Sequence, residues 1–304
     1  SEQKILLSQI YKYLSGNISS IDNRIVKLAN ALKRNKRKSI VISNSNDIDT
    51  QLIVNAINKI LQNYDSTMSI KRPSYIKQGD NNRLNSLVQE MKDGKIGALI
   101  SYNVNPAYNL PNSNEFINSL SNVNLTVAAS LYNDETASLM QYVCPIHHNL
   151  ESWGDACPSH EVYTLMQPTI SPLFNTRQFE ETLLRWVGKE DYYSYLYNFW
   201  ISKGVDWEKS LHDGFFTIKE EELKVKSFNI NQNILDSAAK QSTDIEIEVY
   251  EKIGLGDGSQ ANNPWLQEFP DPISRACWDN YMTISATTAR KLDLQNWNVS
   301  NGAL

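Results

Sequence analysis

The sequence has few of the residues from which redox and metal centres are usually built. Its 304 residues include only three cysteines and four histidines. Three cysteines cannot all pair with one another, and they are too few for an iron–sulfur cluster held by four cysteine ligands. This scarcity excludes a self-contained ferredoxin and a disulfide-dense secreted domain.

Two further absences restrict the partners of this protein. No apolar run approaches the roughly 20 residues that a membrane-spanning helix needs, so we expect no direct membrane span. The 29 Lys and Arg are outnumbered by 34 Asp and Glu, and the net charge is −5. We therefore expect no nucleic-acid partner, because such partners usually require a basic protein surface. The composition is otherwise that of a globular protein, with a length typical of about two domains.

The common nucleotide-binding and hydrolytic motifs GxGxxG, GxxxxGK[ST], GxSxG and HExxH are absent. The sharpest local pattern is Cys144-Pro-Ile-His147 followed by Cys157-Pro-Ser-His160. Two thiolates and two imidazoles could bind zinc tetrahedrally, although the intervening loop is shorter than in zinc fingers. A disulfide between Cys144 and Cys157 is the second interpretation, if the protein is exported. The commonest outcome for such residues is buried, unpaired thiols with imidazoles on the surface.

The ends of the sequence indicate a piece of a longer protein. The chain begins Ser1-Glu2-Gln3 without an initiator Met, and it stops after Asn301-Gly302-Ala303-Leu304 without an evident closing element. No signal peptide is present in the sequence. We therefore expect any targeting signal to lie elsewhere in the parent protein.

A basic run covers residues 33–38, with five charges in six positions. Such a run can form a nuclear-localisation signal or a phosphate-binding patch. The favoured interpretation is a helix C-terminus, where cations complement the helix dipole.

Strands and helices alternate over the first half of the chain. We predict helices at 2–14, 19–34, 48–62, 81–93, 113–120 and 134–139, and strands at 39–43, 67–70, 97–102, 125–129 and 141–144. Continuous apolar strands between helices are typical of a doubly wound, mostly parallel α/β sheet. Ligands bind such sheets at the carboxyl ends of the strands, which here are the polar stretches 43–47, 102–106 and 130–136.

The pattern changes after about residue 150. We predict helices at 177–187 and 190–202, an alternating strand at 245–250, and loops over 251–280. The 190–202 helix is unusually aromatic, which is typical of a buried or interface helix. If it is an interface, loss of Tyr195 or Trp200 should weaken assembly with neighbouring subunits.

Several phrases of the sequence together resemble the molybdopterin oxidoreductase family. The resemblance extends over about residues 38–188, in the family's order and spacing. The phrases are residues 47–63, Asn103-Val104-Asn105-Pro106, Asn133-Asp134-Glu135-Thr136-Ala137, Val143-Cys144-Pro145, Leu150-Glu151-Ser152-Trp153-Gly154-Asp155 and Gln167-Pro168.

A closer resemblance is to one branch of this family, the molybdopterin-like iron–sulfur subunit of alternative complex III in Bacteroidetes and their relatives. It is carried by residues 258–272, GSQANNPWLQEFPDP, then by Trp278-Asp279-Asn280 and by residues 284–289. The resemblance implies a molybdopterin-oxidoreductase-like domain at 1–188 and a helical, irregular α+β insertion and linker at 189–280. Residues 281–304 would then begin a truncated C-terminal barrel.

The resemblance implies a non-catalytic scaffold segment. This segment has no cysteine motif for a cluster and no residue that resembles a molybdenum ligand. Its parent would belong to a respiratory complex that passes electrons from menaquinol to cytochrome c or an oxidase at the periplasmic face of the membrane. The expected partners are membrane subunits that bind quinone, and cytochrome c. The parent's expected cofactors are iron–sulfur clusters.

The alternative is the cofactor-binding domain of an active molybdenum oxidoreductase that uses molybdopterin guanine dinucleotide. Contacts to that dinucleotide, retained or vestigial, would come from Ser43, Asn44, Asn105, Pro106, Asn133, Glu135 and Thr136. A pyrophosphate prefers a glycine-rich turn at a helix N-terminus. The turn Asn44-Ser45-Asn46-Asp47 has no glycine and one acidic residue, which makes it a poor anion site.

Overall fold

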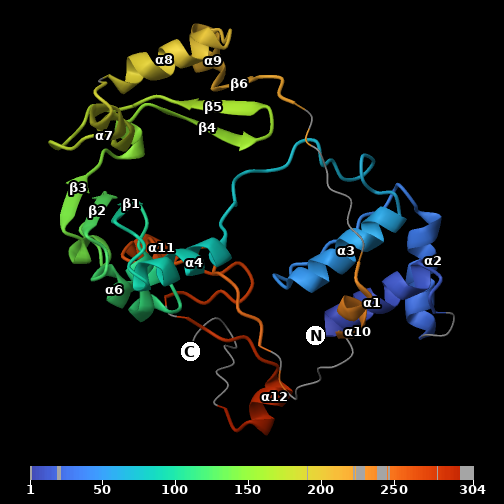
Figure 1. The fold of residues 1–304 in the computed structure, drawn as a ribbon. Helices are drawn as coiled ribbons and strands as arrows, with labels where there is room; N and C mark the ends of the chain where they lie inside the picture. The colour runs from blue at the N-terminus through green and yellow to red at the C-terminus, as the bar shows by residue number, and fades with distance from the viewer. Residues whose placement is uncertain are drawn as a thin grey trace. The chain divides into compact units, whose positions relative to one another are not determined.

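The computed structural model describes residues 2–18, 22–189, 191–221, 223, 230–237, 245, 247–278 and 280–294. Figure 1 shows the helices and strands of the chain, which divides into two compact units, each built from two separate stretches. The first unit comprises Ser1–Leu84 and Pro145–Ile247, and the second comprises Asn85–Cys144 and Glu248–Leu304. The domain limits inferred from the resemblance stay predictions.

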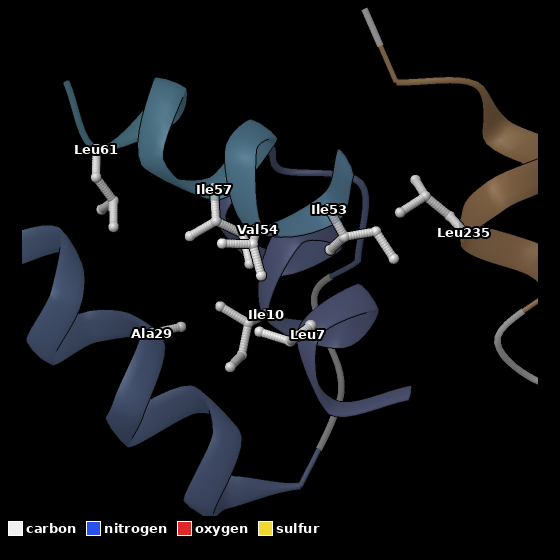
Figure 2. Close-up of a cluster of buried hydrophobic side chains, with 8 residues drawn as sticks. All are labelled: Leu7, Ile10, Ala29, Ile53, Val54, Ile57, Leu61 and Leu235. Atoms are coloured by element: carbon white, nitrogen blue, oxygen red, sulfur yellow. The ribbon is translucent and has the colours of Figure 1, made fainter. Parts of the chain in front are cut away.

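The N-terminal part of the first unit is a helical cluster. It consists of α1 (Glu2–Leu14), α2 (Asn23–Arg34), α3 (Ile48–Ile60) and the short α10 (Gln232–Ser237). Apolar residues repeat at helical spacing and meet in one core, which Figure 2 shows: Leu7, Ile10, Ala29, Ile53, Val54, Ile57, Leu61 and Leu235. Asp22 caps α2 by accepting from the Arg24 amide, and Asp47 caps α3 by accepting from the Thr50 amide.

The strand predicted at 39–43 is wrong, because this extended segment pairs with no strand among the described residues. The buried Asn58 side chain of α3 takes the place of a partner strand. Its Nδ2 donates to the Val41 carbonyl at 2.7 Å, and its Oδ1 accepts from the Val41 amide at 3.0 Å. The strand predicted at 67–70 is reduced to a single bridge between Tyr64 and Met68.

The rest of the first unit contains an antiparallel sheet, which the sequence did not predict. Strands β4 (Gly154–Ser159), β5 (Val162–Met166) and β6 (Phe215–Thr217) lie in that order. The turn η2 (Asn149–Glu151) and helices α7 (Phe179–Trp186), α8 (Tyr192–Ser202) and α9 (Trp207–Asp213) accompany them. Leu196, Trp200, Val205 and Trp207 form the core of this part. The aromatic α8 therefore turns Trp200 inward, whereas Tyr195 is 46% exposed.

The second unit holds a three-stranded sheet in the order β1 (Ala98–Tyr102), β2 (Leu125–Ser130), β3 (Tyr142–Pro145). β1 and β2 are parallel, with register from Ala98 opposite Leu125 to Tyr102 opposite Ala129. The helical elements are α4 (Asn81–Lys92), α5 (Pro106–Asn109), α6 (Ser113–Leu120) and the 3-10 turn η1 (Ala137–Leu139). Val88, Met91, Phe116, Leu120 and Ala128 lie in the core of this unit.

The C-terminal stretch adds α11 (Pro264–Glu268) and α12 (Ala286–Lys291) to the second unit. Gly258 lies against the Tyr108 ring of α5 with a φ of 82°, where an added Cβ would approach the Tyr108 hydroxyl to 3.2 Å. The positive φ and the close approach both favour glycine at this position. The strand predicted at 245–250 is wrong for Ile245 and residues 247–250, and Glu246 lies outside the described residues. Residues 295–304 of the predicted barrel also lie outside them.

The fold is therefore mixed α/β, with a three-stranded parallel sheet and a separate antiparallel sheet. The doubly wound arrangement stays a prediction. Among the described residues, no helix is both long enough and apolar enough to cross a bilayer.

Candidate functional site

The carboxyl ends of β1 and β2 bring two of the predicted site residues into direct contact. Asn105 follows β1 and Thr136 follows β2, and parallel neighbours end at the same edge of a sheet. The Asn105 Oδ1 accepts from the Thr136 amide at 3.1 Å and from the Thr136 hydroxyl at 2.7 Å. Because Thr136 is almost fully buried, these bonds form part of the interior.

The same contact extends to Glu135 and to the start of α5. The Asn105 Nδ2 donates to Glu135 Oε2 at 2.7 Å, and the Ala107 amide donates to the Thr136 hydroxyl at 2.9 Å. The bond from Asn105 holds the pKa of the Glu135 carboxyl below its ordinary value, so this carboxyl is ionised at neutral pH. The Asn105 oxygen and one of its two amide hydrogens are thus bonded within the protein.

The two other predicted residues of the second unit take no part in this network. Pro106 occupies the first turn of α5, where its missing N–H leaves no broken helix bond. Asn133 is exposed on the preceding turn. Beside it, Asp134 accepts from the Ala137 amide at 2.8 Å and so holds the start of η1.

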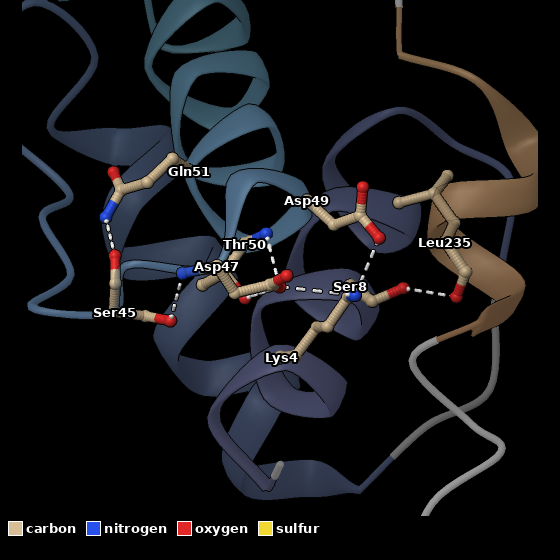
Figure 3. A network of polar contacts seen from close by, with 8 residues as sticks. All are labelled: Lys4, Ser8, Ser45, Asp47, Asp49, Thr50, Gln51 and Leu235. Atoms are coloured by element: carbon tan, nitrogen blue, oxygen red, sulfur yellow. Dashed lines mark hydrogen bonds and ion pairs between the residues drawn. The ribbon is translucent and has the colours of Figure 1, made fainter. Parts of the chain in front are cut away.

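In the first unit, the predicted residues Ser43 and Asn44 lie in the loop that leads to α3. The Gln51 side chain of α3 donates to the Ser43 carbonyl at 3.1 Å and to the Ser45 carbonyl at 2.6 Å. The Ser43 hydroxyl accepts from the Ser45 amide at 3.1 Å. The loop is therefore held by bonds within the chain, several of which are drawn in Figure 3.

Asp47 occupies the N-terminus of α3 with its own carboxylate (Figure 3). It accepts from the Thr50 hydroxyl at 2.7 Å and the Thr50 amide at 3.0 Å, and it pairs with the Lys4 ammonium at 3.2 Å. These contacts, chiefly the Thr50 hydroxyl, lower the pKa of Asp47. Burial would lower the pKa of Lys4, but the hydrogen bonds to Asp49 and Asp47 outweigh it, so the pKa is raised.

An Asp47→Asn variant is expected to lose less stability in acid than the wild type. Because the pKa of Asp47 is lowered in the folded state, the unfolded chain takes up a proton at higher pH. The carboxylate therefore stabilises the fold above the ordinary pKa of Asp, and this contribution disappears as pH falls through the folded-state value. The check is the free energy of unfolding between about pH 6 and about pH 3. The exposed Asp293→Asn serves as control, and equal acid slopes for wild type and Asp47→Asn would contradict the expectation.

The predicted residues fit a dinucleotide pyrophosphate poorly. Such a group is bound by free backbone N–H groups at a helix N-terminus. At α3 the Thr50 amide already donates to Asp47, and at α5 Pro106 has no N–H while the Ala107 amide donates to Thr136. The ionised Glu135 adds a negative charge beside α5. Cofactor contact at the seven predicted residues stays a prediction.

The cysteine–histidine pattern forms no metal centre among the described residues, where no three His, Cys, Asp or Glu side chains converge on one point. His160 is only 4% exposed, which corrects its expected place on the surface. Its Nδ1 lies 3.2 Å from Glu220 Oε2 and 3.4 Å from the Tyr75 hydroxyl. Cys144 and Cys157 are free thiols rather than a disulfide.

Sequence reasoning missed the residues that hold the two loops in place. Lys4 and Gln51 come from helices whose ends meet the 43–47 loop only in the folded chain. The Asp47-x-x-Thr50 pattern was a visible capping signal, since an N-cap aspartate accepts from the amide three residues on. No sequence signal pointed to Glu220 as the partner of His160, because the two lie 60 positions apart.

No protein-family model matches the chain. Over 210 residues it is 26% identical to the menaquinone reductase, molybdopterin-binding-like subunit of Nitratidesulfovibrio vulgaris. The match covers 65% of this chain but 30% of that protein, so the chain corresponds to less than a third of its relative. The similarity supports a molybdopterin-related oxidoreductase subunit. The similarity does not show that the chain comes from alternative complex III.

Proposed function

We propose that this chain is a scaffold segment of a molybdopterin-binding-like subunit in a membrane-associated, quinone-linked electron-transfer complex. The similarity to a menaquinone reductase subunit supports the kind of complex. In this proposal the parent belongs to an oxidoreductase, but the segment itself performs no chemistry. Iron–sulfur clusters elsewhere in the parent carry electrons, and other subunits bind the quinone and cytochrome c at the periplasmic face.

The observation that carries the scaffold role is the contact between Asn105 and Thr136. Asn105 lies at the sheet edge where ligands of such folds bind, yet its amide bonds Thr136 and Glu135. A polar residue that recognises a ligand must direct at least one hydrogen-bonding group at that ligand. Here the oxygen and one amide hydrogen join the turn after β1 to the turn after β2, which leaves only the second amide hydrogen for a ligand. We infer that the network stabilises the sheet edge.

The metal and pterin content of the full-length parent, purified from its own membranes, tests the proposal. We expect abundant iron and acid-labile sulfide, no stoichiometric molybdenum or tungsten, and no pterin fluorescence after acid release. Stoichiometric metal and pterin would overturn the scaffold role and favour an active molybdenum enzyme.

The network itself is tested by an Asn105→Ala variant of the same protein. We expect a loss of about 1–3 kcal/mol in the free energy of unfolding, because the buried Thr136 groups lose their acceptor. Guanosine diphosphate should leave the melting temperature of the wild type unchanged. The matched control is Asn133→Ala, which removes an exposed amide from the same edge. Unchanged stability of Asn105→Ala, together with thermal stabilisation of the wild type by the nucleotide, would indicate a binding site instead.

A further inference from the structure

The surface of α2 and the loop after it concentrates positive charge in an acidic protein. Residues 22–38 contain seven Lys and Arg but one Asp, a net charge of +6, whereas the whole chain carries −5. The basic residues are Arg24, Lys27, Lys33, Arg34, Lys36, Arg37 and Lys38, and all are exposed. We call these residues the α2 basic patch.

Part of the patch lines an open groove of about 560 Å³. Lys27, Asn30 and Arg34 follow one another at positions i, i+3 and i+7, so they share one face of α2. With Lys33 they line the groove, and none of the four is acidic. The Asn30 Oδ1 accepts from the Tyr13 hydroxyl at 3.4 Å, which leaves the Asn30 amide hydrogens available to a ligand in the groove.

The ion pairing of the groove cations differs from that of Arg24 at the start of α2. Among the described residues, no carboxylate lies within ion-pair distance of Lys27, Lys33 or Arg34, whereas Arg24 pairs with Asp22 at 2.9 Å. The helix dipole accounts for Lys33 and Arg34 in the last turn of α2. It does not account for Lys27, about two turns earlier, or for the three cations beyond the helix.

The loop that carries residues 36–38 is anchored to the body of the helical cluster. Arg37 has a φ of 63°, its amide donates to the Leu61 carbonyl at 2.9 Å, and its carbonyl accepts from Ser66 at 2.6 Å. The three cations therefore have fixed backbone positions at the end of α2. A fixed cluster binds anions at a smaller entropic cost than a flexible tail.

We propose that the α2 basic patch binds the phosphate groups of an anionic phospholipid surface. Clusters of four to eight Lys and Arg are attracted to such surfaces. Large apolar side chains lie within the same stretch and beside it, where a membrane interface would accept them: Leu28, Ile40 and Ile42 are all exposed. A nucleic acid offers no apolar interior for these exposed side chains, which favours the lipid surface. This proposal does not depend on the scaffold role.

Sedimentation of the full-length chain with phospholipid vesicles tests the proposal. The variant is the triple substitution Lys27→Gln, Lys33→Gln and Arg34→Gln, which keeps residues compatible with a helix. The matched control removes three exposed cations elsewhere: Lys203→Gln, Lys209→Gln and Lys291→Gln. Circular dichroism confirms that both variants are folded.

We expect the wild type to bind vesicles that contain phosphatidylglycerol and to ignore pure phosphatidylcholine. The patch variant should bind about 100-fold more weakly, given the typical contribution of each Lys or Arg near an anionic surface. The control should change binding less than about 3-fold, and added salt should weaken binding by the wild type. Equal losses in both variants, equal binding to both lipids, or tighter binding to an oligonucleotide than to the vesicles would overturn the proposal.

Discussion

A Trp200→Ala variant is expected to lower the free energy of unfolding by about 3–5 kcal/mol, the range for large aromatic side chains deleted from a core. Trp200 is 5% exposed and packs edge-on against the stacked rings of Tyr163 and Phe216, with centroid distances of 4.9 and 4.8 Å. Its Nε1 donates to Asp155 Oδ2 at 2.8 Å. Truncation therefore removes packing and leaves a half-buried carboxylate without this donor.

Chemical denaturation of the full-length chain, followed by far-ultraviolet circular dichroism, provides the measurement. Tyr195→Ala is the control on the same helix, and it should lose less than about 1 kcal/mol because the residue lies at the surface and is 46% exposed. Trp200→Phe separates the two contributions, since it keeps most of the volume and removes the N–H. We expect it to lose about 1–2 kcal/mol. Similar losses for Trp200→Ala and Tyr195→Ala would contradict the core assignment of Trp200.

This result would also refine the interface hypothesis for the aromatic helix. If α8 contacts another subunit, that contact would come from its exposed side chains rather than from the enclosed Trp200. These are Tyr193, Tyr195, Tyr197, Phe199 and Ile201. An assembly defect of a Trp200 variant would then reflect lost folding of this part of the chain. An assembly defect in a Tyr195 variant of normal stability would indicate an interface.

The second large effect is expected for Asn58→Ala, at about 2–4 kcal/mol, because several buried polar groups would lose their partners together. Asn58 has no exposed surface. Its side chain bonds both backbone groups of Val41, and its Oδ1 also accepts from the Asn63 Nδ2 at 2.9 Å. In the variant, the 39–43 segment loses the group that replaces a partner strand.

Thermal and chemical unfolding of the full-length chain measure the loss, and amide hydrogen exchange locates it. Exchange at the Val41 amide should accelerate more than exchange in the middle of α3. Asn55→Ala is the control, because Asn55 lies on the same helix and is only partly buried. Its side-chain oxygen accepts a hydrogen bond from the Tyr64 hydroxyl. A uniform rise in exchange, or equal losses for both variants, would show that Asn58 does not hold this segment.

The elements that local patterns specify were the ones the sequence predicted well. The predicted limits of α1 and α6 agree with the structure, and β1, β2 and β3 each agree within one residue. Apolar periodicity, capping residues and short apolar runs between turns all act within a few positions of the chain. They therefore specify a helix or strand without contributions from residues far away in the sequence.

The wrong or missing predictions mostly concern pairing between segments that lie far apart in the sequence. The 39–43 run has the apolar character of a buried strand. In this structure, however, the Asn58 side chain rather than a partner strand bonds the Val41 backbone amide and carbonyl. Strand β6 was missed because it joins β5 from about 50 positions away. For the same reason, the burial of His160 against Glu220 had no local signal. The β4–β5 hairpin is local, and its missing prediction has no such explanation.

For the candidate site, the sequence by itself determined the polar residues at the strand ends and the acidic character of the 44–47 turn. Parallel pairing of β1 with β2 made it predictable that Asn105 and Thr136 would lie near each other. Only the tertiary structure decided what these residues do there. Which donor meets which acceptor depends on the angle of side chains from segments 31 positions apart, and in the folded chain those groups bond each other.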